Sequence, residues 1–320
     1  MTKANTIIVT GGLGFIGSRF IQALYKRTDY SIINIDKCTY AAEFTRIPLD
    51  IRHDVDRYRF IKEDISKLGF DKTNTVDNAI LKDVKYVVNF AAESHVDNSI
   101  SDGRPFVRSN VEGVMNLLDT FKDAPNMKKF IQVSTDEVYG DMADLEGDQK
   151  ASESFALRPS SYYSASKASA EMLVQAAART FGVDYIITRS CNNFGPNQDA
   201  EKFLPTVLNC IQKGLRIPIY GTGTQSREWI HVDDNCNIIL DLMLSPVANE
   251  VFNIGSGNSY KNIEIIEMLG KELKKKVNTK HVADRLGHDK VYKIDCTKTE
   301  KLLGSRDYAT LKSFLKNETN

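Results

Sequence analysis

The sequence has no net charge, no long hydrophobic run and no low-complexity linker. Its 42 Lys and Arg residues balance 42 Asp and Glu residues over 320 positions, so no global charge favours nucleic acid or a membrane surface. No apolar segment is long enough to span a bilayer, and the start of the chain, Met1 to Asn5, leads into a strand-like run without a cleavage site. We therefore expect a cytoplasmic protein that binds neither nucleic acid nor membrane.

Cysteine is scarce and dispersed. The cysteines are odd in number, contain no CxxC pair, and stand at Cys38, Cys191, Cys210, Cys236 and Cys296. Such spacing provides neither a disulfide framework nor a zinc site. We expect buried free thiols and no bound metal.

The first half of the chain alternates β-rich runs with amphipathic stretches. The expected strands cover residues 6–10, 31–36, 58–64, 86–91, 130–134 and 185–189, and a long helix covers about 161–181. This alternation is typical of βαβ units, so we expect an α/β protein with a Rossmann-type doubly wound parallel sheet. From Cys191 onward the pattern is turn-rich, which indicates a smaller, interleaved C-terminal lobe.

A glycine-rich turn follows the first expected strand. Gly11, Gly14 and Gly17 form a GxxGxxG pattern before an apolar helix. Glycines at these positions permit a tight turn, close approach of the backbone to a pyrophosphate, and helix–strand packing. Asp36 ends the next strand, where a carboxylate accepts ribose hydroxyls and repels a 2′-phosphate. The pattern predicts a dinucleotide site that prefers NAD to NADP, although Lys37 weakens this preference.

Tyr163 and Lys167 lie four residues apart on the expected long helix and share a face. A nearby cation lowers the pKa of a tyrosine, whose usual value is about 10, so that the phenol can act as a base. The same spacing occurs over residues 58–62 and 308–312. Only the Tyr163 pair opens a helix that follows hydroxyl side chains at the carboxyl end of a strand, where parallel sheets place their sites.

Two adjacent carboxylates, Asp136 and Glu137, follow Ser134 and Thr135 at the end of the fifth expected strand. Alone, an acidic pair in this place is more often a helix cap or a solvated turn. Beside a tyrosine–lysine pair, two further acid–base groups allow an elimination of water in addition to hydride transfer. The combination favours a dehydratase.

Several segments together resemble the nucleoside-diphosphate-glucose 4,6-dehydratases of the extended short-chain dehydrogenase/reductase family. They are the glycine-rich turn and residues 89–97, 134–140, 163–167, 189–196 and 284–289, and the resemblance extends to about Leu303. The STDEVYG and GHD segments within them are specific to this branch. The resemblance implies bound NAD, a nucleotide-sugar substrate, either dTDP-glucose or UDP-glucose, and a homodimer.

The resemblance also implies roles for the acid–base groups. Tyr163, helped by Thr135, takes the O4 proton of the sugar while the C4 hydride passes to NAD. Glu137 then removes the acidified C5 proton, and Asp136 protonates the departing C6 hydroxyl. The hydride returns to C6 and C5 is reprotonated, which gives a 4-keto-6-deoxy sugar and regenerates NAD. The expected catalytic residues are Thr135, Asp136, Glu137, Tyr163 and Lys167.

Binding residues follow from the same resemblance. The expected cofactor contacts are Gly11, Gly14, Phe15, Ile16, Gly17, Asp36, Lys37, Thr39, Asp64, Ile65, Ala91, Ala92, Ser94, Ser109, Tyr163, Lys167 and Asn193. The expected substrate contacts are His95, Thr135, Asn192, Lys202, Phe203, Pro218, Ile219, Tyr220, Arg227, Asn262, Arg285 and His288, with the cations on the pyrophosphate. Asp64 taken alone is a turn residue about as often.

The chain is expected to divide into two interleaved bodies. Residues 1–190 with about 228–257 form the NAD-binding Rossmann domain, and residues 191–227 with about 258–320 form the nucleotide-sugar-binding lobe. For the dimer, we expect the long helix to present small apolar residues outward to a four-helix seam, namely Ala168, Ala170, Leu173, Val174 and Ala177. The alternative is that these residues pack on the sheet.

The sequence departs from the dehydratase pattern in three places. Asn98 replaces the arginine common after HVD, Leu286 replaces the proline of DRPGH, and the end after Gly304 lacks the usual tryptophan and long closing helix. Asn98 is closer to relatives of which some use UDP-glucose, so the choice between uracil and thymine stays open. A single methyl group distinguishes the two bases.

Two other functions share part of this pattern. A 4-epimerase or decarboxylase of the extended family would share the fold, Tyr163 and Lys167, but epimerisation needs no acid–base pair to expel water. A non-catalytic NAD-sensing regulator on the same scaffold could dispense with the tyrosine–lysine pair. Adjacent Asp136 and Glu137 favour the dehydratase over both.

Overall fold

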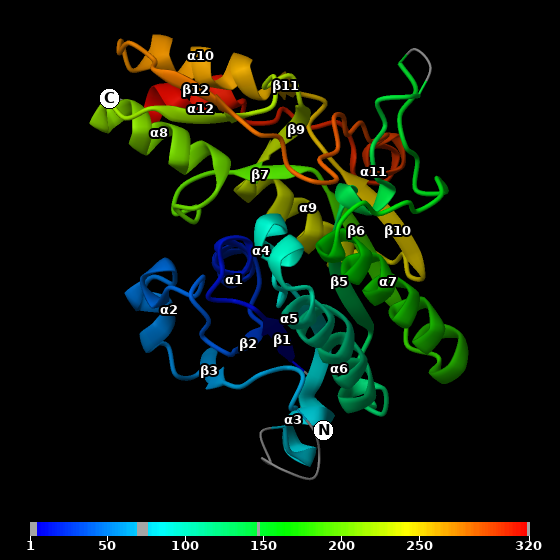
Figure 1. Ribbon diagram of the computed structural model, residues 1–320. Coiled ribbons are helices and arrows are strands. Elements are labelled where there is room, and N and C mark those ends of the chain that lie inside the picture. Colours follow the sequence, from blue (N-terminus) through cyan, green and yellow to red (C-terminus); the bar gives the residue numbers. More distant parts are fainter. Residues whose placement is uncertain (1–4, 69–75, 146–147, 319–320) are drawn as a thin grey trace.

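The computed structural model describes residues 5–68, 76–145 and 148–318. Met1 to Ala4, on which the expectation of no signal peptide partly rests, lie outside the described residues. Among the described residues, no helix combines the length and the apolar character needed to cross a membrane. In Figure 1 a sheet flanked by helices carries a smaller group of helices and strands at one end.

Within the described residues, seven parallel strands form the main sheet in the order β10-β6-β5-β4-β1-β2-β3. Their bounds are β1 (Thr6–Thr10), β2 (Ser31–Asp36), β3 (Tyr58–Lys62), β4 (Val84–Asn89), β5 (Lys129–Thr135), β6 (Tyr185–Ser190) and β10 (Glu250–Ile254). The strand order reverses at β1, which pairs with β2 on one side and β4 on the other. Doubly wound sheets bind ligands at this switch point, beyond the carboxyl ends of the strands.

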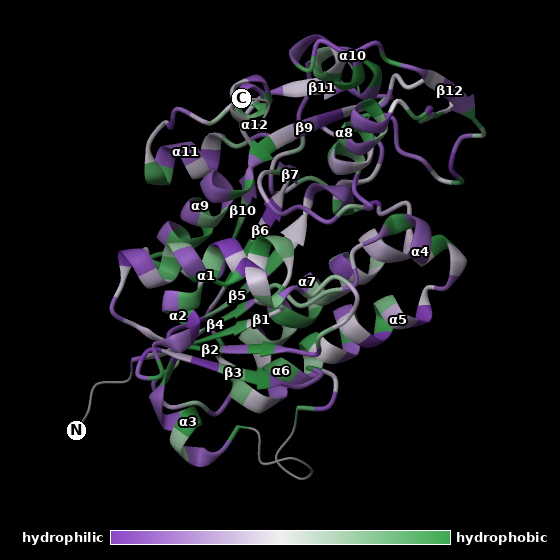
Figure 2. Cartoon of the chain, turned by 90° about the vertical axis from the view of Figure 1, so that its left-hand side faces the viewer, coloured by the Kyte–Doolittle hydropathy of each residue, from purple (hydrophilic) through white to green (hydrophobic). Residues whose placement is uncertain are grey.

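Helices cover both faces of the sheet. Ile7 and Val9 of β1 face the layer that contains α1 (Phe15–Arg27) and α9 (Val232–Leu244). Ile8 faces the opposite layer, which contains α3 (Asn78–Asp83), α6 (Gly113–Phe121) and α7 (Tyr162–Phe181). Shorter helices in the same part of the chain are α2 (Leu49–His53), α4 (Val96–Ser101), α5 (Arg104–Phe106), the 3₁₀ turns Phe44–Arg46 and Asp136–Tyr139, and the π-helical turn Val107–Glu112. Strands buried on both faces read as continuous apolar runs, and Figure 2 shows this hydrophobic colouring on β1, β4 and β5.

The predicted doubly wound α/β fold is confirmed. The strands at 6–10 and 31–36 have the predicted bounds, whereas the strand predicted over 86–91 runs from Val84 to Asn89. α7 begins after Ser161, whose hydroxyl forms a capping box with Ser164, and it ends at Gly182 in the left-handed region with φ of 73°. This cap fixes the start of α7 and therefore the place of Tyr163 in its first turn.

A second lobe lies beyond the carboxyl ends of the main strands (Figure 1). In it, β7 (Asn192–Phe194), β9 (Ser226–His231) and β11 (Ser259–Lys261) form one small sheet, and β8 (Ile217–Tyr220) pairs with β12 (Thr279–Val282). Its helices are α8 (Phe203–Lys213), α10 (Asn262–Glu272) and α12 (Leu311–Glu318), and α11 (Thr297–Leu303) lies against β10. The lobe has its own core around Phe194 and Trp229. The chain builds β7, α8, β8 and β9 between β6 and α9, so the lobe is interleaved with the sheet as predicted.

The outward face of α7 differs from the prediction. The small residues expected to meet a partner subunit pack against the sheet instead, since Ala168, Ala170, Val174 and Ala177 are all buried. Leu173 is half-buried. The exposed apolar side chains of this helix include Tyr162 and Met172, which are 64% and 51% exposed. The prediction that these residues face outward is therefore wrong, because α7 is turned about its axis so that they face the sheet.

Candidate active site

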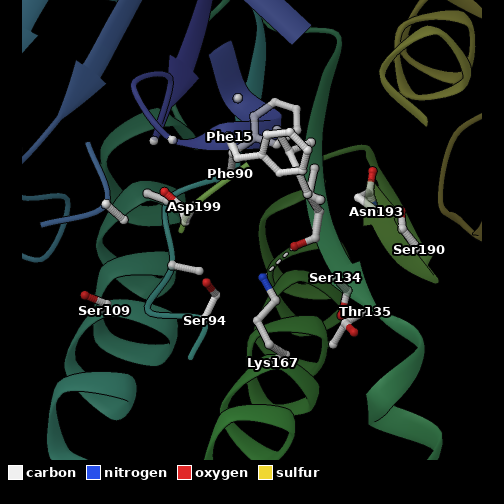
Figure 3. A pocket seen from close by; sticks show the side chains of 18 of the residues that line it. Phe15, Phe90, Ser94, Ser109, Ser134, Thr135, Lys167, Ser190, Asn193 and Asp199 are labelled. Carbon is white, nitrogen blue, oxygen red and sulfur yellow. Dashed lines mark hydrogen bonds between the residues drawn. The ribbon is translucent and has the colours of Figure 1, made fainter. Parts of the chain in front are cut away.

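A cavity lies at the carboxyl ends of β1, β2, β4 and β5, where the second lobe covers the switch point. In Figure 3, Ser94 and Ser109 lie to one side of the Lys167 side chain, and Ser190 and Asn193 lie to the other. The cavity contains all but one of the predicted cofactor contacts, namely Gly11, Gly14, Phe15, Ile16, Gly17, Asp36, Lys37, Thr39, Ile65, Ala91, Ala92, Ser94, Ser109, Tyr163, Lys167 and Asn193. The exception is Asp64.

The glycine-rich turn forms one wall of this cavity. Gly11 has a φ of +69°, and a Cβ atom there would lie 2.6 Å from the backbone nitrogen of Ala91. A side chain at Gly17 would collide with the Gly11 carbonyl. The turn leads into α1 with Gly14 as the N-cap, which turns backbone N–H groups at the helix start toward the cavity. A dinucleotide pyrophosphate fits this wall, because the backbone can approach it and the helix terminus favours negative charge.

Asp36 is fixed at the end of β2. Its carboxylate accepts hydrogen bonds from the backbone N–H of Leu13 at 3.0 Å and of Cys38 at 2.8 Å, and the side chain lines the cavity. Lys37 donates to Ser109 at 2.7 Å and pairs with Glu93 at 3.1 Å. Because Glu93 offsets the Lys37 charge, Lys37 argues less strongly for a 2′-phosphate than the sequence alone suggests.

Asp64 is a turn residue in this structure. Its carboxylate accepts hydrogen bonds from the backbone N–H and the hydroxyl of Ser66, both at 2.9 Å. The neighbouring Glu63 and Ile65 line the cavity in its place. Of the two expectations for Asp64, the structure matches the turn.

Tyr163 lies in the first turn of α7 with its ring 6.3 Å from that of Phe106. Burial, followed by the negative charge of Glu137, raises the pKa of Tyr163 above its usual value, while a hydrogen bond with Thr135 lowers it. Lys167 donates to the carbonyl of Val133 at 2.6 Å, and burial lowers the Lys167 pKa to about 8. The Lys167 ammonium is directed to β5, so the group that lowers the Tyr163 pKa here is Thr135, and a lowering by Lys167 stays a prediction.

Asp136 and Glu137 occupy a 3₁₀ turn at the end of β5. Asp136 is 1% exposed, and burial followed by the charges of Glu137 and Glu228 raises its pKa well above its usual value. One carboxyl oxygen of Asp136 lies 3.3 Å from the Thr135 hydroxyl, and the other has no hydrogen-bond partner within the described part of the chain. A raised pKa favours the protonated form of a buried carboxyl, which suits a proton donor.

Glu137 has a different electrostatic environment from its neighbour. Burial raises its pKa, but the cations Arg227 and Lys202 act in the opposite direction. The backbone N–H of Glu137 donates to the Thr135 hydroxyl at 3.3 Å, which holds the start of the turn. After burial, the largest influence on the pKa of Glu137 is the cation Arg227, whereas the largest on the pKa of Asp136 is the negative charge of Glu137. This difference suits a base and an acid.

A second cavity adjoins the first. It contains seven of the predicted substrate contacts, namely His95, Asn192, Lys202, Phe203, Arg227, Arg285 and His288. Ser94, Glu137, Asn192 and Lys202 line both cavities. A sugar carried by the cations of the second cavity would therefore meet the first cavity at Glu137.

Neighbouring rings and carbonyls hold Arg227, whereas Arg285 is held by a ring and by the Asp97 carboxylate at 2.8 Å. The Arg227 guanidinium lies 4.3 Å from the Tyr292 ring centroid and donates to the carbonyl of Asp289 at 2.7 Å. Arg285 lies 4.5 Å from the ring centroid of Tyr220. These contacts orient positive charge without neutralising it at Arg227, which suits a diphosphate.

Of the remaining predicted substrate contacts, all but Thr135 lie outside both cavities. Tyr220 lies beside them, next to Arg285 and with its ring 6.4 Å from that of His288. Ile219 belongs to the core of the second lobe, and neither Pro218 nor Asn262 lines either cavity. Thr135 lines the first cavity only.

Sequence reasoning missed several lining residues. They include Ser134, Ser190, Gln198 and Asp199 in the first cavity, and Glu201, Asp289 and Tyr292 in the second. The segment 189–196, which resembles the dehydratases, is followed directly by Gln198, Asp199 and Glu201. This proximity in the sequence could have indicated that they line the site. Among the described residues, no group of three or more His, Cys, Asp and Glu side chains could hold a metal ion.

Comparison with known proteins adds to this geometry. The model of the NAD dependent epimerase/dehydratase family matches residues 7–255. The low-salt glycan biosynthesis protein Agl12 of Haloferax volcanii is 40% identical over 92% of each chain. The dTDP-glucose 4,6-dehydratase 1 of Escherichia coli is 36% identical over 96% of this chain and 90% of its own.

Solved structures agree with the sequence relatives. A double mutant of the dTDP-glucose 4,6-dehydratase DesIV from Streptomyces venezuelae, with NAD bound, has a TM-score of 0.88 at 35% identity and covers 98% of this chain and 94% of its own. The UDP-glucuronic acid 4-epimerase of Bacillus cereus also reaches 0.88, at 27% identity and 98% coverage of both chains. The resemblance to 4,6-dehydratases is confirmed. The chain belongs to the NAD dependent epimerase/dehydratase family.

Proposed function

We propose that this chain is an NAD-dependent nucleoside-diphosphate-glucose 4,6-dehydratase. The observation that carries the proposal is the carboxyl pair of buried Asp136 and half-buried Glu137, which lines the first cavity together with Tyr163 and Thr135 and reaches the second cavity at Glu137. The relatives and structural neighbours named as dTDP-glucose 4,6-dehydratases support it. Bound NAD would supply the oxidation at C4 and return the same electrons at C6.

The chain's own residues would move the protons. Tyr163 and Thr135 would take the proton of the C4 hydroxyl. Glu137, whose charge Arg227 and Lys202 stabilise, would remove the C5 proton that the 4-ketone acidifies. Asp136, whose raised pKa favours its protonated form, would donate a proton to the departing C6 hydroxyl as water leaves.

The cofactor would lie along the first cavity. The glycine-rich turn would hold the pyrophosphate and Asp36 the adenosine ribose, which favours NAD over NADP. The nucleotide sugar would lie in the second cavity with its diphosphate on Arg227, Arg285 and Lys202. The proposal includes the division into an NAD-binding domain and a nucleotide-sugar-binding lobe. The substrate is either dTDP-glucose or UDP-glucose. We also propose a cytoplasmic location, because it suits five free thiols.

The fold does not separate a dehydratase from a 4-epimerase, because the Bacillus cereus epimerase shares it at the same TM-score. The carboxyl pair separates them, since only the elimination needs a second acid and base. Purified protein should be incubated with dTDP-glucose and UDP-glucose in parallel and the products analysed by mass spectrometry. Loss of one water from either substrate supports the dehydratase, whereas a product of unchanged mass that differs at C4 would assign an epimerase. Tyr163→Phe is the inactive control.

We also propose that two copies pair through α6 and α7, although through other residues than predicted. The exposed apolar side chains on and next to these helices are Val107, Met115, Tyr162 and Met172, which are 47%, 50%, 64% and 51% exposed. Exposed apolar side chains on neighbouring helices are typical of a helical interface. Light scattering at micromolar concentration should give twice the chain mass, and Met172→Lys should shift it toward a monomer.

A further inference from the structure

An ion pair joins the two lobes across the first cavity. The Arg46 guanidinium lies 2.6 Å from the Asp199 carboxylate, and the two side chains are only 9% and 19% exposed. Arg46 ends the 3₁₀ turn that follows β2, whereas Asp199 lies in the segment between β7 and α8. Because the partners are 153 residues apart and belong to different lobes, the pair restricts the movement of one lobe relative to the other.

Arg46 also contacts two other parts of the cofactor cavity. The same guanidinium donates to the carbonyl of Leu13 in the glycine-rich turn at 3.2 Å, and to the carbonyl of Ala41 at 2.7 Å. Ala41 and Asp199 both line the cavity. Arg46 therefore connects the turn expected to hold the pyrophosphate, the loop after β2, and the second lobe.

The segment that carries Asp199 is attached to the other side of the cavity as well. The Gln198 amide donates to the carbonyl of Asn193 at 3.0 Å, and Lys202 donates to the carbonyl of Ser94 at 3.2 Å. Glu201 accepts a hydrogen bond from Tyr40 at 3.2 Å. Residues 198–202 thus span the cavity and are tied at both edges.

We propose that Arg46 and Asp199 are positioning residues that hold this segment across the cofactor cavity and slow the release of NAD. The proposal rests on the proposed function. A dehydratase that returns its electrons to the same NAD molecule needs no exchange of cofactor between turnovers, so slow release costs it nothing in rate. Release requires the segment to move away, and that movement breaks a largely buried, charge-assisted hydrogen bond.

Asp199→Asn removes the charge while keeping the shape, and we expect it to accelerate NAD release roughly ten- to hundredfold, the range for a hydrogen bond to a charged group. Arg46→Lys keeps the charge but cannot reach all three acceptors, so it should give an intermediate rate. It also serves as a second variant should the first fold poorly.

Another ion pair between distant parts of the chain serves as a control. Arg19 of α1 pairs with Asp233 of α9 at 2.6 Å, and neither residue lines the cofactor cavity. This pair also joins distant parts of the chain, so Asp233→Asn reports the general effect of losing such a contact. We expect it to leave the NAD release rate within about twofold of the wild-type rate.

The experiment loads each protein with radiolabelled NAD and follows loss of label after an excess of unlabelled NAD is added. Faster release from Asp199→Asn and Arg46→Lys, with Asp233→Asn unchanged, supports the proposal. Release from Asp199→Asn at the wild-type rate, or equal acceleration by Asp233→Asn, would overturn it while leaving the proposed function intact. A wild-type protein that binds no NAD would refute both.

Discussion

Replacing Glu137 by glutamine should separate the oxidation at C4 from the elimination at C5 and C6. The amide has nearly the same shape as the carboxyl but cannot accept the C5 proton, and loss of a general base slows a reaction by about 10²–10⁴-fold. Thr135 and Tyr163, the residues proposed to act at C4, stay in place. Because the Glu137 charge raises the pKa of Tyr163, its removal should lower that pKa and leave the oxidation no slower.

Two measurements test this separation. Rapid-mixing absorbance should show reduced nicotinamide accumulating in Glu137→Gln after substrate is added, because the step that consumes it is blocked. Mass spectrometry in deuterated water should show little deuterium at C5. Glu267→Gln, an exposed carboxylate on α10, is the control and should behave as wild type. Near-normal dehydration and C5 exchange in Glu137→Gln would refute the assignment of this residue as the base.

Other variants test the remaining groups. Tyr163→Phe should leave the nicotinamide oxidised when substrate is added, with a loss of at least about 10² in rate. Because the pKa of Asp136 is raised, its acid form persists above the usual carboxyl range, so dehydration should decline as pH rises through that pKa, and Asp136→Asn should remove this dependence from the pH–rate profile. Wild-type turnover should produce no net reduced nicotinamide, and steady stoichiometric accumulation would indicate a simple dehydrogenase. Glu171→Gln should lower the free energy of unfolding in urea by about 3–5 kcal/mol, because it leaves Arg189 charged, buried and without its ion-pair partner; a change below 1 kcal/mol would contradict this.

Local sequence patterns predicted the sheet well, because β-branched runs and glycine turns determine where strands begin and end. The carboxyl ends of β1, β2 and β5 brought Gly11, Asp36 and Asp136 to one cavity as expected. Patterns of this kind report spacing along the chain. They say little about contacts between segments that are far apart in it.

The errors follow from that limit. Small residues on α7 looked suitable for an interface, yet Ala170 and Val174 pack on the sheet, since a helix with apolar residues on several sides does not reveal its inward face. The pKa of Tyr163 depends on Glu137, which comes from another element. The pairing of Arg46 with Asp199 has no local signature at all.

The interleaved course of the chain has a consequence for synthesis on the ribosome. β6 becomes an internal strand only when β10 pairs with it, and β10 follows the main segment of the second lobe. A nascent chain that ends soon after residue 190 therefore carries an unpaired sheet edge made of Ile186, Ile187 and Thr188, which in the finished protein are fully buried. Such an edge is a template for aggregation. The nucleotide-binding half is consequently a poor candidate for separate expression, and chaperones should be needed most while residues 191–254 are being made.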